Sequence, residues 1–444
     1  MGCIVAKFGG SSLATAGQMK KVAAIVRQNP DRRYIVPSAP GKAPEFQEKV
    51  TDLLYGLQRA ATEQDMVTFE ILFSQIEARY QAIVDGLGTQ FDIHTPLQTV
   101  RQAILEGGDA DYAASRGEYL NGLILADFLD IPFIDPAGGI LFDANGEFDE
   151  SGTQLRFSAL LRRHERGVIP GFYGVMPGGR IKTFSRGGSD ITGAIVARAV
   201  GADLYENWTD VSGFLMTDPR IVHNPRTISK ISYRELRELS YMGASVLHED
   251  SIFPVQKGGI PINVKNTNEP EHPGTLIVAE PDDDHGRITG IAGKKGFTII
   301  HMEKDKMNSE LGFGRRVLSV FEQLGISFEH MPSGIDTLSV VISDAQLEGH
   351  MTEILDHLHR DCRPDHIEVV NNLALIATVG HGMVRRVGIA ATLFTALSEA
   401  GVNVRMIDQG SSEINIIVGV ESDDFEVALR AVYACFENEE DWID

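Results

Sequence analysis

Strand-like and helix-like patterns of hydrophobic and polar residues take turns along the first two thirds of the chain. An apolar run at 3–6 leads through Lys7 into Gly-Gly-Ser-Ser, after which Met19, Val22 and Val26 recur at helical spacing. A long helical region is expected over about 46–84. Further buried-strand patterns stand at 34–37, 131–135, 167–173, 203–208 and 260–264. Strands that alternate with helices predict an α/β fold, with a mostly parallel sheet covered by helices on both faces.

The last third of the chain repeats itself. A shift of 76 positions lays Gly312 on Gly388 and aligns apolar positions around them. Each copy reads strand, helix, strand, strand, helix, strand, which predicts a pair of βαββαβ units. A polar stretch at 282–286 marks the boundary before the pair. The expected domains are an α/β domain at 1–290, a first small domain at 297–370, open to completion by the C-terminal end, and a second at 371–444.

Composition adds broad limits to this picture. The chain has 444 residues, of which 43% are hydrophobic and 23% charged, as in ordinary globular proteins. No apolar run approaches the roughly 20 residues that span a bilayer, and the N-terminus has no signal-peptide layout. The three cysteines, Cys3, Cys362 and Cys435, form no metal or redox motif. These features favour a reducing cytoplasm.

The net charge of −22 excludes nucleic acid as a general partner, because binding a phosphate backbone requires a basic face. A small anionic ligand remains compatible with this charge if cations gather locally. The candidate cations are Lys7, Lys182, Arg186, Arg220 and Lys265.

Two glycine-rich loops are candidates for such anion binding. Arg186-Gly187-Gly188-Ser189-Asp190 runs directly into a helical pattern, and a helix N-terminus presents free N–H groups and partial positive charge. A tight turn before a capped helix is the alternative, but it does not account for the arginine. The Gly-Gly-Ser-Ser stretch after Lys7 repeats the arrangement of strand, glycine loop and helix. It is not a Walker A loop, because the chain contains no GxxxxGK[ST].

Six motifs in order resemble the aspartate kinases (aspartokinases) of the amino acid kinase family. They are Lys7-Phe8-Gly9-Gly10-Ser11-Ser12, Ser38-Ala39-x-Gly41, Gly117-Glu118, Phe184–Asp190, Trp208-Thr209-Asp210-Val211-x-Gly213 and Thr217-Asp218-Pro219-Arg220. The doubled C-terminal unit resembles the tandem, ferredoxin-like ACT domains of these enzymes. The resemblance covers nearly the whole chain. It implies an amino acid kinase fold and ATP-dependent phosphorylation of L-aspartate to 4-phospho-L-aspartate, the first step toward lysine, threonine and methionine.

The resemblance also implies roles for individual residues. Catalytic roles fall to Lys7, Arg186 and Asp190. Aspartate is expected at Ser38, Glu118, Arg186 and Ser189, with Arg186 on the α-carboxylate and Glu118 toward the amino group. ATP is expected at Lys7, Gly9, Gly10, Ser11, Thr209, Asp210, Asp218, Arg220 and Lys265. An end-product amino acid, lysine or threonine, is expected at Met307, Ser309, Gly312, Glu329 and His330.

The chemistry of this reaction agrees with the residues present. A carboxylate acceptor has a pKa of about 3.9 and is ionised at neutral pH, so no general base is required. Positioning and charge neutralisation are required instead, from cations, backbone donors and Mg²⁺ held mainly by the nucleotide phosphates rather than by a protein metal site. An arginine can grip a carboxylate through two parallel hydrogen bonds.

Two alternatives remain open at this point. A kinase of the same fold could act on glutamate, acetylglutamate, carbamate or a nucleoside monophosphate. A non-catalytic amino-acid sensor is the second alternative, kept open by Leu215, which stands where the family usually has an aromatic residue. In either case the resemblance implies a homodimer or larger assembly joined through the ACT sheets.

Overall fold

The computed structural model describes residues 2–185, 187–244, 252–280 and 288–437. The chain forms two compact units, each built from more than one segment. The first unit contains Met1–Phe214, Thr227–Tyr233 and Val246–Glu280, and the second contains Leu215–Arg226, Arg234–Ser245 and Pro281–Asp444.

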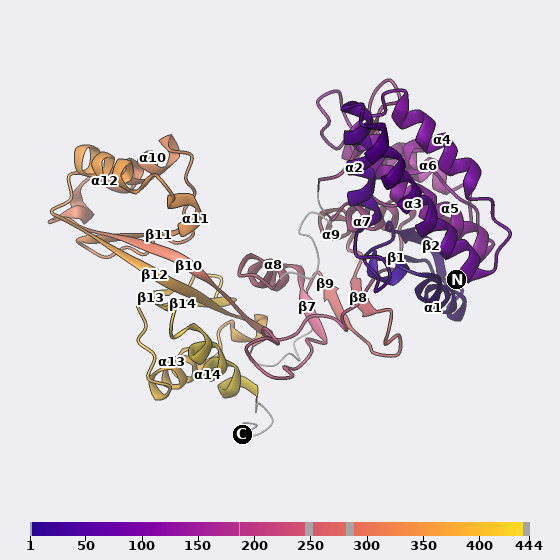
Figure 1. Cartoon of the computed structure of the whole chain (residues 1–444). Coiled ribbons are helices and arrows are strands. Elements are labelled where there is room, and N and C mark those ends of the chain that lie inside the picture. Colours follow the sequence, from indigo (N-terminus) through magenta and orange to yellow (C-terminus); the bar gives the residue numbers. More distant parts are fainter. Residues whose placement is uncertain (1, 186, 245–251, 281–287, 438–444) are drawn as a thin grey trace. The chain divides into compact units, whose positions relative to one another are not determined.

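A seven-stranded sheet forms the centre of the first unit (Figure 1). Its strands, in spatial order, are β3 (Gly167–Val168), β2 (Arg32–Pro37), β1 (Ile4–Phe8), β6 (Leu204–Thr209), β8 (Ile262–Asn266), β9 (Thr275–Val278) and β7 (Lys230–Ser232). Every neighbouring pair is parallel except β8 with β9. The predicted α/β fold with a mostly parallel sheet is confirmed.

Helices cover this sheet on both faces. Those described in the first unit are α1 (Ala16–Gln28), α2 (Val50–Thr62), α3 (Met66–Leu87), α4 (His94–Leu105), α5 (Ala110–Leu129), α6 (Glu150–Leu161), α7 (Gly188–Val200) and α9 (Ile252–Gly258). The long helical region expected over 46–84 consists of two helices, because the chain turns between α2 and α3. Gln64 has a φ of 57°, and the Asp65 side chain accepts a hydrogen bond from the Thr68 N–H at 3.1 Å, which begins a new helix.

The main hydrophobic core lies between α1–α5 and one face of the sheet, while α7 packs on β1, β2 and β6. A buried ion pair sits beneath this core. The Arg32 guanidinium donates to both carboxylate oxygens of Glu206, at 2.7 and 3.1 Å, and Trp208 Nε1 donates to Glu206 at 2.8 Å. The pair joins β2 to β6, the strands on either side of β1. Only 9% of the Arg32 side chain and 5% of the Glu206 side chain are exposed.

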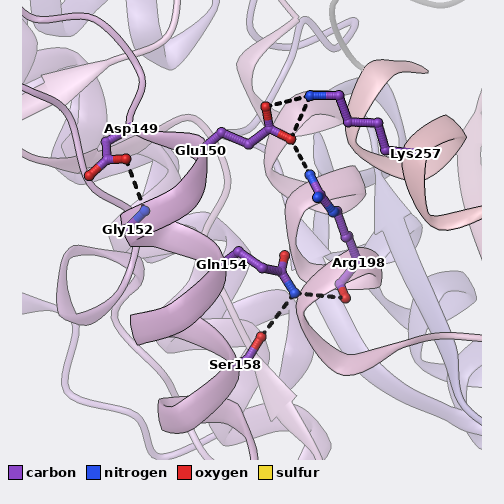
Figure 2. Close-up of polar contacts among 7 residues, drawn as sticks. All are labelled: Asp149, Glu150, Gly152, Gln154, Ser158, Arg198 and Lys257. Atoms are coloured by element: carbon purple, nitrogen blue, oxygen red, sulfur yellow. Dashed lines mark hydrogen bonds and ion pairs between the residues drawn. The ribbon is translucent and has the colours of Figure 1, made fainter.

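Helix α7 is also fixed at its C-terminal end, as Figure 2 shows. The Glu150 carboxylate on α6 accepts hydrogen bonds from Arg198 on α7 and from Lys257 on α9, the latter at 2.7 and 2.9 Å. Gln154 Nε2 donates to the Ser158 hydroxyl at 3.1 Å and to the Arg198 carbonyl at 3.4 Å. With this end held, the N-terminal end of α7 has a defined position against the sheet.

The second unit is built around two long strands that run side by side (Figure 1). They are β10 (Gly290–Glu303) and β12 (His366–Val379), each of 14 residues. Together with β11 (Thr337–Ser343), β14 (Asn415–Glu421) and β13 (Met406–Asp408) they form one antiparallel sheet in the order β11-β10-β12-β14-β13. Both copies of the repeat therefore share a single sheet.

The repeat departs from the expected pattern at two places. The strand expected over 326–330 is reduced to an isolated bridge between His330 and Val341, because the Gln346 side chain takes up the Ser327 N–H at 2.9 Å. Strand β10 begins before residue 297, and 290–295 pair with 374–379. The proposed domain limits at 290, 297 and 370 remain predictions.

The helices of the repeat lie against this sheet, and some of the chain before the repeat joins the same unit. The helices are α10 (Phe313–Gln323), α11 (Asp344–Leu347), α12 (Met351–His357), α13 (Ile389–Glu399) and α14 (Phe425–Glu437). The Ile291 N–H donates to the Met216 carbonyl at 2.6 Å. Helix α8 (Tyr233–Tyr241) brings Glu235, which accepts from the Thr289 hydroxyl and the His381 N–H, both at 2.6 Å.

Within the described residues, no helix is both long enough and apolar enough to cross a membrane.

We predict that Glu206→Gln lowers the free energy of unfolding by about 3 kcal/mol, because it leaves the buried Arg32 without its carboxylate. Urea denaturation followed by circular dichroism measures this loss. Glu150→Gln is the matched control, since its carboxylate is half exposed and its ion pairs are worth about 1 kcal/mol or less. Equal losses in the two variants would contradict the prediction.

Candidate active site

The candidate site begins where the carboxyl ends of β1 and β6 meet the N-terminus of α7. Lys7 on β1 forms an ion pair with Asp190 in the first turn of α7, with Nζ 2.6 Å from Oδ1. The Asn207 amide on β6 donates to the same oxygen at 2.8 Å. Only 8% of the Lys7 side chain and 18% of the Asp190 side chain are exposed. The sheet and the helix thus hold a largely buried cation and anion in contact.

Two loops beside this pair pack backbone against backbone. The Gly9 N–H donates to the Trp208 carbonyl at 2.9 Å, and the Gly41 N–H donates to the Gly10 carbonyl at 2.9 Å. A Cβ on Gly41 would stand 2.7 Å from the Gly10 carbonyl carbon. Glycine is required here because of this close approach rather than because of a turn. The loop after β1 and the loop after β2 therefore have a fixed separation.

Helix α5 presents two buried polar side chains to the loop after β2. Asn121 Nδ2 donates to the Ser38 carbonyl at 2.6 Å, while Asn121 Oδ1 and Glu118 Oε2 have no hydrogen-bond partner. Burial raises the pKa of Glu118 to about 7, against the lowering effect of the nearby Ala39 backbone and Ser189 side chain. A buried acceptor without a partner lowers the stability of the ligand-free protein. A ligand with an ammonium group would donate to this oxygen and remove that cost.

The hairpin of β4 (Tyr173–Val175) and β5 (Ile181–Thr183) leads into the glycine loop before α7. Lys182, one of the candidate local cations, pairs with Asp111 at the start of α5, at 2.9 Å. Asp111 also accepts hydrogen bonds from the Thr183 hydroxyl and N–H. Lys182 therefore anchors the hairpin, and its charge is already matched. Arg186, expected to be catalytic and to bind aspartate, lies outside the described residues.

The residues expected on the nucleotide side divide between the two units. Thr209 and Asp210 follow β6, and Lys265 Nζ on β8 lies 5.1 Å from the centre of the Trp208 ring. Asp218 and Arg220 belong to the second unit, where they form an ion pair at 2.6 Å. Hydrogen bonds from Arg220 lower the pKa of Asp218. The ATP-binding roles of all these residues stay predictions.

The expected effector residues all belong to the second unit. Met307 is buried, Ser309 donates its hydroxyl hydrogen to the Lys306 carbonyl at 2.9 Å, and Gly312 begins α10 with a φ of 78°. Glu329 accepts a hydrogen bond from Tyr241 on α8, and His330 Nδ1 lies 2.6 Å from Asp408 Oδ2. The structure brings them into one unit, but their effector-binding role stays a prediction.

Among the residues that the structure describes, no group of three or more histidine, cysteine, aspartate or glutamate side chains is arranged to hold a metal ion. The Asp190 carboxylate of the candidate site is largely buried, and its Oδ1 is shared by Lys7 and Asn207. A metal at this site would depend on oxygen ligands brought by another molecule.

Sequence reasoning missed three side chains that organise the site: Asn207, Asn121 and Asp111. Asn207 could have been found, because strand alternation places it on the same face of β6 as Thr209, two positions on. Asn121 follows Glu118 by one helical turn, which is a weaker signal. No signal in the sequence pointed to Asp111, since its partners are more than 70 residues away in sequence.

Comparison with known families supports two parts of the chain separately. The family model described as the amino acid kinase family matches residues 2–266, and the one described as an ACT domain matches residues 376–436. The first of these matches covers more than half of the chain.

Individual proteins are similar over nearly the full length. Aspartokinase 3 of Bacillus subtilis is 38% identical, covering 97% of this chain and 98% of its own. A crystal structure of the allosteric aspartate kinase of Clostridium acetobutylicum has a TM-score of 0.89 and 54% identity, covering 98% of this chain and 100% of its own. Escherichia coli aspartokinase III with aspartate and ADP has a TM-score of 0.74 and 25% identity, with the same coverage. Its complex with lysine and aspartate has a TM-score of 0.72, 25% identity, and coverage of 98% and 99%.

We predict that Glu118→Gln stabilises the ligand-free protein at pH 8 but not at pH 4. A carboxyl whose pKa rises from 4.5 to about 7 on folding costs stability as pH rises through that window, by about 3 kcal/mol once it is complete. Glutamine carries no such cost. Thermal unfolding of both proteins across this pH range tests the sign, and a difference that does not change with pH would contradict it.

Proposed function

Since this chain belongs to the amino acid kinase family and, within it, to the aspartokinases, we propose that it phosphorylates the β-carboxylate of L-aspartate with ATP. The observation that carries the proposal is the juxtaposition of the buried Lys7–Asp190 pair with Glu118, a buried carboxyl that has one oxygen without a partner. The first feature suits a transferring phosphate and the second suits the ammonium group of an amino acid. Escherichia coli aspartokinase III binds aspartate and ADP in its crystal structure.

The reaction is a displacement at phosphorus. A β-carboxylate oxygen of aspartate forms a bond to the γ-phosphorus, the bond from that phosphorus to the β,γ-bridging oxygen breaks, and ADP leaves with the electron pair. No proton is removed from the acceptor, because the carboxylate is already ionised. The protein has to hold two anions in line and neutralise their charge.

Each described residue contributes to one of these tasks. The Lys7 ammonium can contact the γ-phosphate while it remains paired with Asp190, and the N–H groups of Gly10 and Ser11 can donate to phosphate oxygens. The Gly9 N–H is already bonded to the Trp208 carbonyl, so Gly9 contributes by letting the loop approach the phosphate. The N-terminus of α7 adds partial positive charge beside Ser189. Glu118 in its ionised form pairs with the ammonium group of aspartate. Arg186 is proposed for the α-carboxylate on the resemblance alone.

Magnesium would enter with the nucleotide, held through phosphate oxygens and water, with Asp190 as the acceptor that the protein can add. When bound, the ion supplies neutralisation of charge on the phosphates. A site without its own cluster of carboxylates fits this mode of binding.

We further infer that an end-product amino acid regulates the enzyme through the ACT units, near Met307–Ser309 and Glu329–His330. Escherichia coli aspartokinase III also crystallises with lysine, which supports lysine as a first ligand to test. We infer a homodimer or larger assembly through the ACT sheets, and a cytoplasmic enzyme consistent with three free thiols, Cys3, Cys362 and Cys435.

The test is acceptor-dependent release of ADP, with hydroxylamine added to trap the acyl phosphate. Aspartate should support turnover, and glutamate, acetylglutamate, carbamate and a nucleoside monophosphate should not. Turnover with another of these acceptors alone would assign a different kinase of the same fold. No turnover with any acceptor, together with an effector-induced rise in thermal stability, would instead favour a sensor.

We predict that Lys7→Ala lowers kcat about 100-fold or more, because it removes the cation that faces the charge developing on the γ-phosphate. The same assay at saturating aspartate and ATP measures it. Lys257→Ala removes a lysine from an ion pair with Glu150 in the same unit and serves as the matched control, with little change in kcat. Near-normal turnover by Lys7→Ala would remove Lys7 from this role.

We predict that the KM for aspartate rises about tenfold per pH unit below pH 7 and is flat above it. Burial raises the pKa of Glu118 to about 7, so below this pH the carboxyl is protonated and no longer pairs with the substrate ammonium. Initial rates from pH 5.5 to 8.5 give the profile. In Glu118→Gln the KM should be high and independent of pH, and a profile that matches the wild type would contradict the assignment.

A further inference from the structure

Arg79 on α3 is an unusual buried cation in the first unit. Only 2% of the residue is exposed, and no ion pair joins it to a carboxylate in the part of the chain that the structure describes. Two of its donor atoms, Nε and Nη1, have no hydrogen-bond partner. The Glu45 carboxylate attracts Arg79 only from beyond ion-pair contact. Burying a charge without a contacting counter-ion costs free energy, so this arginine requires an explanation beyond packing.

The contacts that Arg79 does make both lead to the loop between β2 and α2. Nη2 donates to the Gly41 carbonyl at 2.6 Å, and the guanidinium carbon lies 4.1 Å from the centre of the Phe46 ring. A guanidinium over an aromatic face is attracted to it, more strongly when water is excluded. Ala43 and Phe46 form two backbone hydrogen bonds of 2.9 Å with each other. Arg79 therefore contacts this loop at Gly41, two residues before the turn, and at Phe46, the last residue of the turn.

The same loop includes Ser38, which is expected to bind aspartate, and it contacts Gly10 in the loop expected to bind phosphate. Gly41 contacts Gly10 through its N–H, in an approach that leaves no room for a Cβ. Two residues before Gly41, the Ala39 backbone lies near enough to Glu118 to lower the pKa of that carboxyl. One residue further back, the Ser38 carbonyl accepts from Asn121. A shift of Gly41 would disturb Ser38 and Ala39 directly, and Gly10 through contact.

We propose that Arg79 is a positioning residue for aspartate, which holds the loop after β2 against Gly10 so that both substrates are aligned. The proposal rests on the proposed function, because it assigns Ser38 and Glu118 to aspartate. Arg79 itself touches neither substrate. Burying Arg79 costs free energy, but it fixes the separation between the loop after β1 and the loop after β2. Small displacements of substrate-binding groups have large kinetic effects.

Arg79→Met should raise the KM for aspartate about tenfold or more, because the loop loses the hydrogen bond at Gly41 and the cation on Phe46. The KM for ATP should change less, because Gly9 keeps its own hydrogen bond to Trp208. Arg79→Lys retains a cation that can reach the Gly41 carbonyl, so it should bring the KM for aspartate back toward the wild-type value. Substrate saturation curves and thermal unfolding are measured for every variant.

Arg27→Met is the matched control. Arg27 on α1 likewise donates to a backbone carbonyl, that of Phe128, at 3.0 Å and lies over that residue's ring at 5.4 Å. This variant should lower the thermal midpoint without changing either KM. If Arg79→Met lowers the midpoint and leaves the KM for aspartate unchanged, Arg79 only stabilises the fold and the proposal is overturned.

A second variant covers the case in which Arg79→Met does not fold. Phe46→Leu removes the ring from a partly exposed side chain and should raise the KM for aspartate in the same direction, about threefold or more. An unchanged KM in that variant would overturn the proposal. Failure of the proposed function is seen separately, as an absence of aspartate-dependent ADP release in the wild-type protein.

Discussion

The contact between Lys7 and Asp190 is the interaction on which the candidate site depends. It joins the end of strand β1 to the first turn of α7, and Asn207 on the neighbouring strand β6 shares the same carboxylate oxygen. The molecule as a whole carries a net charge of −22, so a largely buried lysine is one of the few places where an anion would meet positive charge. Without a ligand, Asp190 neutralises that charge. With phosphate present, the ammonium can serve both partners.

Several features around this pair lower stability and have a functional explanation instead. Glu118 is buried with an unpartnered oxygen, Asn121 has an unpartnered carbonyl oxygen, and Arg79 is buried with two unpartnered donors. All three lie beside the loop after β2. Unsatisfied buried groups are rare in folded proteins. A ligand could complete the hydrogen bonding of Glu118 and Asn121, whereas Arg79 acts on the loop and touches no substrate.

The division into two units does not follow the order of the chain. Residues 215–226 and 234–245 lie within the span matched by the amino acid kinase family, yet they belong to the unit that contains the ACT repeat. Asp218 and Arg220, expected to bind nucleotide, thus belong to the same unit as the residues expected to bind an effector. Hydrogen bonds from Ile291 to Met216 and from Arg226 to Tyr433 hold this segment on β10 and α14. A motif for one ligand and a site for another can share a rigid support in this way.

The sequence by itself determined the fold class, the duplicated C-terminal unit, and the Lys7 and Ser189–Asp190 loops. These features are visible in the sequence itself. The strand and helix periods and the glycines are local, and the repeat appears when the chain is compared with itself at a shift of 76 residues. Three contacts were decided only by the tertiary structure. Lys182 forms an ion pair with Asp111, both copies of the repeat contribute strands to one sheet, and Arg79 holds the loop at Gly41. Each of these depends on residues that are distant in sequence and adjacent in space. No local pattern records such a contact, because the energy of a buried charge depends on what surrounds it after folding.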